Sequence, residues 1–259
     1  MEEALARLND YEIALVVTDS AVKDISYLIS CGIPLHKIRS LLHEKVVSED
    51  KTFIPSKKFW GQNGEDVILA LLFTEKNIAP SNVKYLEIGT NDPIFGNNSY
   101  YFYERGGRGV LVDPLPSAGI MANMVRPNDH FIQAAVTGES SSEKKVFYVD
   151  ETVTAISSLH PAWMKESKAK GEHTVHEIEV RVIGINDLIQ EIGFSPNLLL
   201  IDAEGEDENI LYNLDFTVYH PLAIIVESIS GELITYMRSK GYIWYANIQE
   251  TNFVFLREM

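Results

Sequence analysis

Polar and acidic residues follow two hydrophobic runs of this chain. The run Val83–Ile88 leads into Gly89-Thr90-Asn91, and the run Gly109–Val112 leads into Asp113. Glycine lets the backbone turn sharply and approach a ligand closely. Ligands of open parallel sheets bind beyond the carboxyl ends of the strands. We therefore expect a nucleoside pocket here, with Asp113 accepting hydrogen bonds from the ribose hydroxyls.

Two further carboxylates stand at the ends of later hydrophobic runs. Asp202 follows Leu198–Ile201, and Glu227 follows Ala223–Val226. If both runs are parallel strands, these side chains lie side by side at the same sheet edge. Together they can bind a substrate hydroxyl, remove its proton or hold a divalent cation that acidifies it, and Glu204 can join them.

The elements that must position these residues alternate between strand and helix patterns. This alternation predicts an α/β fold in which helices cover both faces of a mostly parallel sheet. Two later runs are separated by only a few residues, as in a hairpin, and they predict an antiparallel closing pair that completes a seven-stranded sheet. The predicted strands are Val83–Ile88, Gly109–Val112, His130–Val136, Leu198–Ile201, Ala223–Val226, Tyr242–Asn247 and Asn252–Leu256.

Two regions depart from this alternation. Residues 19–46 have helical spacing, so residues 1–58 are predicted to form a helical extension and linker before a domain at 59–259. The apolar stripes of this extension can pair with a second copy of the chain in a homo-oligomer. An insert at about 145–183 contains the strand-like segments Lys145–Asp150 and His176–Ile183 and can cover the open face of the pocket.

Composition narrows the choice of partner and compartment. The net charge of -15 repels nucleic acid at long range, and we expect no nucleic-acid partner. No apolar run reaches the roughly 18 residues of a membrane span, and the start of the chain does not resemble a signal peptide. The single cysteine, Cys31, agrees with a reducing compartment. We therefore expect a cytoplasmic protein with a small-molecule substrate.

Five short segments of the chain follow one another in a recognisable order. They are Gln62-Asn63-Gly64-Glu65-Asp66, Leu86-Glu87-Ile88-Gly89-Thr90-Asn91, Val112-Asp113-Pro114, Ile201-Asp202-Ala203-Glu204-Gly205 and Ile224-Ile225-Val226-Glu227. Together they resemble the FkbM family of S-adenosylmethionine-dependent methyltransferases. The resemblance runs from about residue 59 to the C-terminus, and it implies a Rossmann-like class I methyltransferase fold. It also implies S-adenosylmethionine as cofactor and methylation of a hydroxyl on a sugar or secondary metabolite.

The resemblance suggests where each part of the cofactor binds. Glu87 can reach the methionine ammonium, and Ala134 leaves room for the adenine. Where the family often has a second glycine, this chain has Asp92-Pro93, so a longer loop is expected, with Asn98 or Ser99 capping the next helix. The predicted cofactor-binding residues are Gln62, Asp66, Glu87, Gly89, Thr90, Asn91, Ser99, Asp113, Ala134 and Asp202.

The predicted catalytic residues are Asp202, Glu227 and His160, the last as a base contributed by the insert. Related sugar O-methyltransferases that depend on a metal place carboxylates after the same two strands, which leaves open a Mg²⁺ site of Asp202, Glu227 and Glu204. Each acid can instead be a helix cap or a solvated turn residue. The sequence does not decide between a direct base and a metal.

Two other functions are alternatives to methyl transfer. A nicotinamide-dependent enzyme acting on nucleotide sugars is disfavoured because the glycines after Ile88 do not follow the spacing G-x-G-x-x-G. A catalytically silent relative that assembles through the helical extension is also compatible with the fold, although the presence of Asp113, Asp202 and Glu227 favours an enzyme.

Overall fold

The computed structural model describes residues 60–161, 174–227, 229–248 and 251–258. The predicted helical extension over residues 1–58 lies outside these ranges, and so does the pairing surface assigned to residues 19–46. No helix in the described ranges has the length and apolar character needed to cross a membrane.

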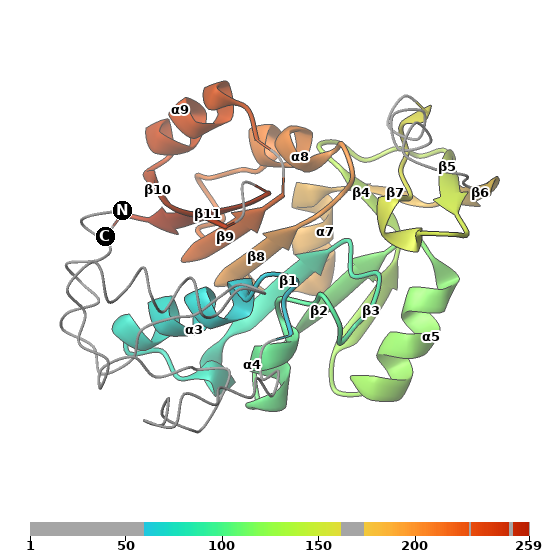
Figure 1. The fold of residues 1–259 in the computed structure, drawn as a ribbon. Coiled ribbons are helices and arrows are strands. Elements are labelled where there is room, and N and C mark those ends of the chain that lie inside the picture. The colour runs from blue at the N-terminus through green and yellow to red at the C-terminus, as the bar shows by residue number, and fades with distance from the viewer. Residues whose placement is uncertain (1–59, 162–173, 228, 249–250, 259) are drawn as a thin grey trace, which may run out of the picture.

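A seven-stranded sheet forms the centre of the fold (Figure 1), in the order β10-β11-β9-β8-β1-β2-β3. All neighbouring pairs are parallel except those that involve β11, which runs antiparallel to both β9 and β10. The predicted sheet and its closing hairpin are thereby confirmed. The strands are β1 (Lys84–Ile88), β2 (Arg108–Asp113), β3 (His130–Gln133), β8 (Leu198–Ile201), β9 (Ala223–Val226), β10 (Tyr242–Ile248) and β11 (Asn252–Arg257).

Helices cover both faces of this sheet (Figure 1). One face carries α3 (Glu65–Glu75), α4 (Tyr100–Glu104) and α5 (Pro116–Val125), and the other carries α7 (Ile185–Ile192), α8 (Asp207–Asn213) and α9 (Gly231–Ser239). The central strand β8 explains the pattern, because successive side chains of a strand point to opposite faces. Leu198 and Leu200 pack with α3, while Leu199 and Ile201 pack with α7 and α8.

The predicted single strands His130–Val136 and His176–Ile183 are wrong in extent. The first divides into β3 and β4 (Ala135–Thr137), and the second into β6 (Val175–Val180) and β7 (Val182–Gly184). The division occurs because the chain changes hydrogen-bond partners. The amide of Ala134 still donates to the carbonyl of Asp113, whereas the amide of Ala135 donates to the carbonyl of Arg181. β4 pairs in parallel with β7 and so leaves the main sheet.

The insert is built on a second two-stranded unit. β5 (Lys145–Asp150), which has the predicted bounds, pairs antiparallel with β6. The short helix η3 (Thr154–Ile156) lies between them in the chain, and a similar turn, η2 (Pro80–Asn82), precedes β1. The β5–β6 pair lies beyond β3 and β4, near the end of the sheet where the strands finish (Figure 1).

Candidate functional site

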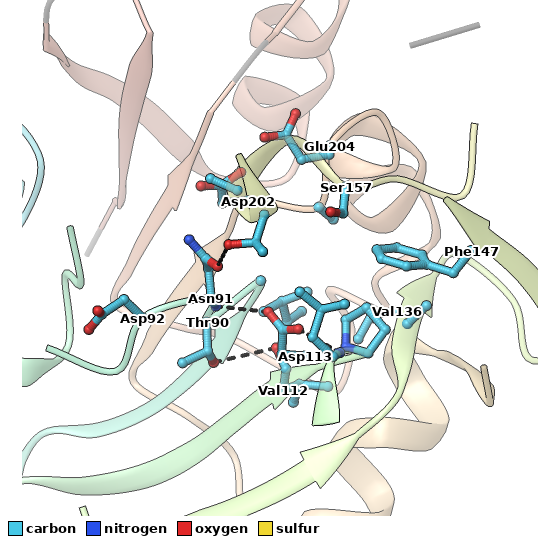
Figure 2. A pocket seen from close by; sticks show the side chains of 18 of the residues that line it. Thr90, Asn91, Asp92, Val112, Asp113, Val136, Phe147, Ser157, Asp202 and Glu204 are labelled. Carbon is cyan, nitrogen blue, oxygen red and sulfur yellow. Dashed lines mark hydrogen bonds between the residues drawn. The ribbon is translucent and has the colours of Figure 1, made fainter. Parts of the chain in front are cut away.

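A cavity of about 360 Å³ opens at the carboxyl ends of β1, β2 and β8, with part of its wall supplied by the insert (Figure 2). This is the edge at which ligands of open parallel sheets bind. Eight of the residues predicted to bind cofactor or metal line the cavity, namely Gln62, Gly89, Thr90, Asn91, Asp113, Ala134, Asp202 and Glu204.

Asp113 lies in the cavity wall between the loops that follow β1 and β2 (Figure 2). Its Oδ2 accepts a hydrogen bond of 2.8 Å from the amide of Asn91, and its Oδ1 accepts one of 2.8 Å from the amide of Leu115. Burial raises the pKa of Asp113 to about 6, although these two hydrogen bonds favour the ionised form. A carboxylate oxygen has a second lone pair, so both oxygens can still accept hydroxyl protons.

Gly89 lets the loop after β1 pass close to the loop after β8. Its φ of 81° is in the left-handed region, and a Cβ at this position would lie 1.7 Å from the carbonyl oxygen of Asp202. Any other residue would push these two loops apart. The close approach keeps Asp202 at the same cavity as Asp113.

Apolar side chains form one end of the cavity. Leu115 follows β2, Val136 belongs to β4, and Phe147 and Leu159 come from the insert. Figure 2 shows Phe147 and Asp92 on opposite sides of Asp113. Ala134 lies in the same wall and contributes only a methyl group, which leaves space for a flat ring.

Two hydrogen bonds hold the insert over the cavity. Oγ1 of Thr154 donates to Oδ1 of Asn91 at 2.8 Å, and Oγ of Ser158 donates to the carbonyl of Glu204 at 2.6 Å. The insert is thereby joined to the loop after β1 and to the loop after β8. The sequence indicated that an insert can cover the pocket, but it did not identify Phe147, Thr154 or Leu159 as lining residues.

Three carboxylates gather at the cavity edge after β8 and β9. One oxygen from each of Asp202, Glu204 and Glu227 lies within 4.8 Å of the other two. Burial raises the pKa of Asp202 well above 3.8, and the charges of Glu227, Glu204 and Asp207 raise it further. Because like charges this close oppose ionisation, the cluster favours either a shared proton or a bound cation.

Asp66, Glu87 and Ser99 do not line the cavity. Asp66 is buried at the start of α3, where its Oδ2 accepts from the amide of Trp60 at 2.8 Å. Glu87 points away from the cavity and accepts from Oγ of Ser99 at 2.5 Å. Burial raises the pKa of Glu87, and the charge of Arg126, 3.7 Å away, opposes that rise.

The side chain that caps α4 is Asn97, whose Oδ1 accepts from the amide of Tyr100 at 3.0 Å. Ser99 occupies the N-cap position, as expected, but the expectation that the side chain of Asn98 or Ser99 caps the helix is wrong. Ser99 has no side-chain capping bond and instead takes part in the buried contacts around Arg126.

His160 lies beside the cavity and does not line it. Its Nε2 is 2.8 Å from Oε1 of Glu206, and its side chain is 44% exposed. Glu206 also accepts from Nδ2 of Asn209 at 2.6 Å. The insert thus brings His160 to the start of α8. Its partner Glu206 is two residues after Glu204 of the carboxylate cluster.

A family model described as the Methyltransferase FkbM domain matches residues 87–244. The matched range includes the loops after β1, β2, β8 and β9, and it leaves Gln62 and Asp66 outside. A comparison with curated proteins found no match.

Proposed function

Because the chain belongs to the FkbM methyltransferase family, we propose that it is an S-adenosylmethionine-dependent O-methyltransferase. Its proposed acceptor is a hydroxyl group of a sugar or secondary metabolite. The observation that carries this proposal is one cavity lined by Asp113 and by Asp202 of the carboxylate cluster. The same cavity has an apolar slot formed by Leu115, Val136, Phe147 and Leu159, with Ala134 beside it. A nucleoside and a hydroxylated acceptor both find suitable partners in it.

The chemistry of the lining fits the cofactor. Asp113 offers acceptors for the ribose hydroxyls, and the slot around Phe147 and Ala134 suits an adenine ring. Gly89 lets the backbone approach the ligand. At the other end, Gln62 and Asp92 offer polar partners to the amino-acid part of the cofactor. When bound, S-adenosylmethionine supplies an electrophilic methyl group on a sulfonium.

The carboxylate cluster provides the base. Asp202 lines the cavity and has a raised pKa, so its ionised form accepts a proton more readily than an ordinary carboxylate does. Glu227 and Glu204 lie within reach of the same proton. In the proposed reaction Asp202 holds the acceptor hydroxyl in line with the reactive carbon and takes its proton, and Glu227 orients the hydroxyl.

The same three side chains fit a hard divalent cation, which prefers carboxylate oxygens. Asp202, Glu204 and Glu227 would hold Mg²⁺, and its charge would acidify the acceptor hydroxyl. His160 is the second candidate base: it lies outside the cavity lining, and its Nε2 is 2.8 Å from Oε1 of Glu206, two residues after Glu204.

Calorimetry with S-adenosylmethionine and S-adenosylhomocysteine tests the proposal directly. We expect both nucleosides to bind in the micromolar range, and NADH to give no heat. Transfer of a labelled methyl group to a panel of sugars and hydroxylated metabolites, with Mg²⁺ or with EDTA, then identifies the acceptor and the metal requirement. Absence of heat with both sulfur nucleosides would contradict the proposed function.

A further inference from the structure

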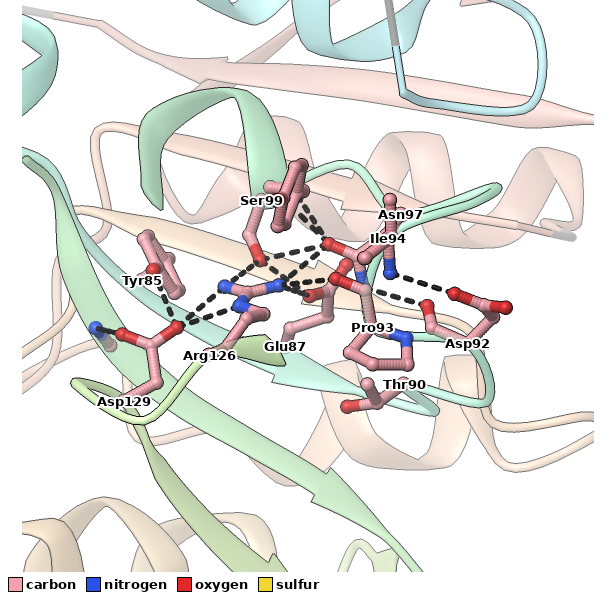
Figure 3. A network of polar contacts seen from close by, with 12 residues as sticks. Tyr85, Glu87, Thr90, Asp92, Pro93, Ile94, Asn97, Ser99, Arg126 and Asp129 are labelled. Carbon is pink, nitrogen blue, oxygen red and sulfur yellow. Dashed lines mark hydrogen bonds and ion pairs between the residues drawn. The ribbon is translucent and has the colours of Figure 1, made fainter. Parts of the chain in front are cut away.

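Arg126 is buried at the end of α5, between Asp129 and the loop after β1 (Figure 3), and it does not line the cavity. Its side chain has no exposed surface. Burial by itself lowers the pKa of an arginine, but the neighbouring Tyr85, Glu87 and Asp129 raise the pKa of Arg126 above its ordinary value. A buried guanidinium is stable only where its donors are paired, so its partners are informative.

One group of partners belongs to the loop after β1. Nη1 of Arg126 donates to the carbonyl of Pro93 at 3.3 Å and to Oδ1 of Asn97 at 2.9 Å, and Nη2 donates to Oγ of Ser99 at 2.8 Å. A single side chain therefore holds the loop at three positions. Asn97 in turn caps α4, so the start of this helix is held by the same contacts.

The other partner is Asp129, in the turn before β3, which itself contacts residues of β1 and β2. Nε of Arg126 donates to Oδ2 of Asp129 at 2.8 Å, and the hydroxyl of Tyr85 donates to the same oxygen at 2.7 Å. Oδ1 of Asp129 accepts from the amide of Gly109 at 3.0 Å. Through Asp129, Arg126 thus connects the loop to β1 and β2 of the sheet.

The loop held in this way forms one end of the cavity. Asp92, Phe95 and Gly96 line it, and Oδ1 of Asp92 accepts from the amides of Ile94 at 2.8 Å and Phe95 at 2.9 Å. This end lies across Asp113 from Phe147 (Figure 2). The segment between Asn91 and Asn97 is therefore held by Asp113 at its start and by Arg126 at Pro93 and Asn97.

We propose that Arg126 is a positioning residue: through Pro93, Asn97 and Ser99 it holds the loop after β1 in the shape that binds the amino-acid part of the cofactor. This inference rests on the proposed function. Glu87, which the sequence assigned to the cofactor ammonium, acts in the same network as a partner of Ser99 and a counter-charge to Arg126. The adenosine part of the ligand meets Asp113 and the apolar slot, which Arg126 does not contact.

The test compares two ligands that differ only in the amino-acid part. The affinities of S-adenosylhomocysteine and adenosine are measured by calorimetry for the wild type, Arg126→Met, Arg126→Lys and the control Arg181→Met. Arg181 pairs with Glu191 at the surface, so its replacement removes an ion pair away from the loop. Thermal unfolding of each variant is recorded alongside.

We expect Arg126→Met to weaken S-adenosylhomocysteine binding about tenfold or more, as loss of several charged hydrogen bonds implies, and to leave adenosine binding within about twofold. Arg126→Lys keeps the charge and should recover part of the loss, and Arg181→Met should change neither affinity. If Arg126→Met does not fold, Arg126→Lys must show the same difference, with weaker S-adenosylhomocysteine binding and little change in adenosine binding. Equal weakening of both ligands, or no weakening of either, would overturn the inference alone. A wild type that binds neither ligand would overturn the proposed function as well.

Discussion

The amide of Asn91 donates a hydrogen bond of 2.8 Å to Oδ2 of Asp113, which joins the loops after β1 and β2 across the cavity wall. The other oxygen of Asp113 accepts from the amide of Leu115 at 2.8 Å. The carboxylate that we assign to ribose recognition therefore also shapes the loops beside the ribose. Its two roles can be separated by substitution and by pH.

Asp113→Ala should abolish binding of S-adenosylhomocysteine, because it removes both the ribose acceptors and the two backbone contacts. Asp113→Asn keeps one acceptor oxygen and should weaken binding by about one to two powers of ten. For the wild type, affinity should fall as the pH drops through about 6, since protonation of Asp113 replaces an acceptor by a donor. Calorimetry over this pH range checks all three expectations. Unchanged affinity of Asp113→Ala for S-adenosylhomocysteine would contradict the assignment of Asp113 to ribose binding.

Gly89→Ala should disrupt the site by steric overlap. Its new Cβ would lie 1.7 Å from the carbonyl oxygen of Asp202, and its φ of 81° is strained for alanine. We expect a loss of more than about 3 kcal/mol in the free energy of unfolding, or no folded protein. Urea unfolding measures the loss.

Gly193→Ala is the matched control for that substitution. Gly193 has a similar φ of 73°, but nothing lies within 4 Å of the position of its Cβ. Alanine there should cost about 1 kcal/mol from backbone strain alone. Equal losses of unfolding free energy in the two variants would mean that the close approach of Gly89 to Asp202 is not needed for stability.

The sequence predicts the sheet well because its strands are simple. The bounds of β8 and β9 match the predicted ones residue for residue, since each strand is a run of apolar residues buried on both faces and followed by an acid. The region after β3 is harder. Ile132, Ala135 and Val136 are buried whether the strand continues or changes sheets, so hydrophobicity cannot show that β4 pairs with β7.

The role of Arg126 could not be read from the sequence. It lies in Arg126-Pro127-Asn128-Asp129, which resembles an exposed turn, and only the acid at the third following position hints at a pair. Its loop partners Asn97 and Ser99 are distant in the chain and meet it only after β1, β2 and α5 are packed. For the same reason the sequence predicted Glu87 as a ligand residue. It lies two residues before Gly89 in the chain, but its charge partner in the fold is Arg126.

Asp202→Asn should reduce methyl transfer by at least about 100-fold while S-adenosylhomocysteine affinity changes only a few-fold, because a neutral amide cannot take the acceptor proton. In the wild type, kcat should rise with pH through a pKa above the ordinary carboxyl range, since burial and Glu227 raise the pKa of Asp202. The exposed Glu179 provides the control Glu179→Gln, which should behave as the wild type. Full turnover by Asp202→Asn would assign the base elsewhere, with His160 the next residue to replace.

Asp66 should make stability depend on pH. It is fully buried, its Oδ1 has no hydrogen-bond donor among the residues that the structure describes, and burial raises the pKa of Asp66 to about 7. A carboxyl with a raised folded pKa stabilises the protein when protonated, and that stability is lost as the pH rises from about 4 to about 7. Asp66→Asn should therefore be more stable than the wild type by about 1 to 3 kcal/mol at about pH 8, with the difference much reduced at about pH 5. Urea unfolding at both pH values measures this.

Asp215 supplies a control of opposite sign. It is exposed, and hydrogen bonds from Thr217 lower the pKa of its carboxyl. Its contribution to the free energy of unfolding is present above the unfolded pKa and is lost as the pH falls. Asp215→Asn should therefore lower the free energy of unfolding at about pH 8, and lower it less in acid. If Asp66→Asn is instead the less stable protein at about pH 8, the carboxylate of Asp66 must be ionised and paired in the folded state.

Phe147→Ala should weaken the binding of adenosine and of S-adenosylhomocysteine by the same factor, about five to ten, because the aromatic ring forms part of the slot that both ligands share. Val146→Ala is the matched control. Val146 precedes Phe147 on β5, and its 41% exposed side chain lies on the opposite face of the strand, away from the cavity. Calorimetry with the two ligands distinguishes this end of the cavity from the loop held by Arg126, where only the ligand with the amino-acid part should lose affinity. A loss confined to S-adenosylhomocysteine in Phe147→Ala would reverse the assignment of the two ends and place the adenine beside Asp92.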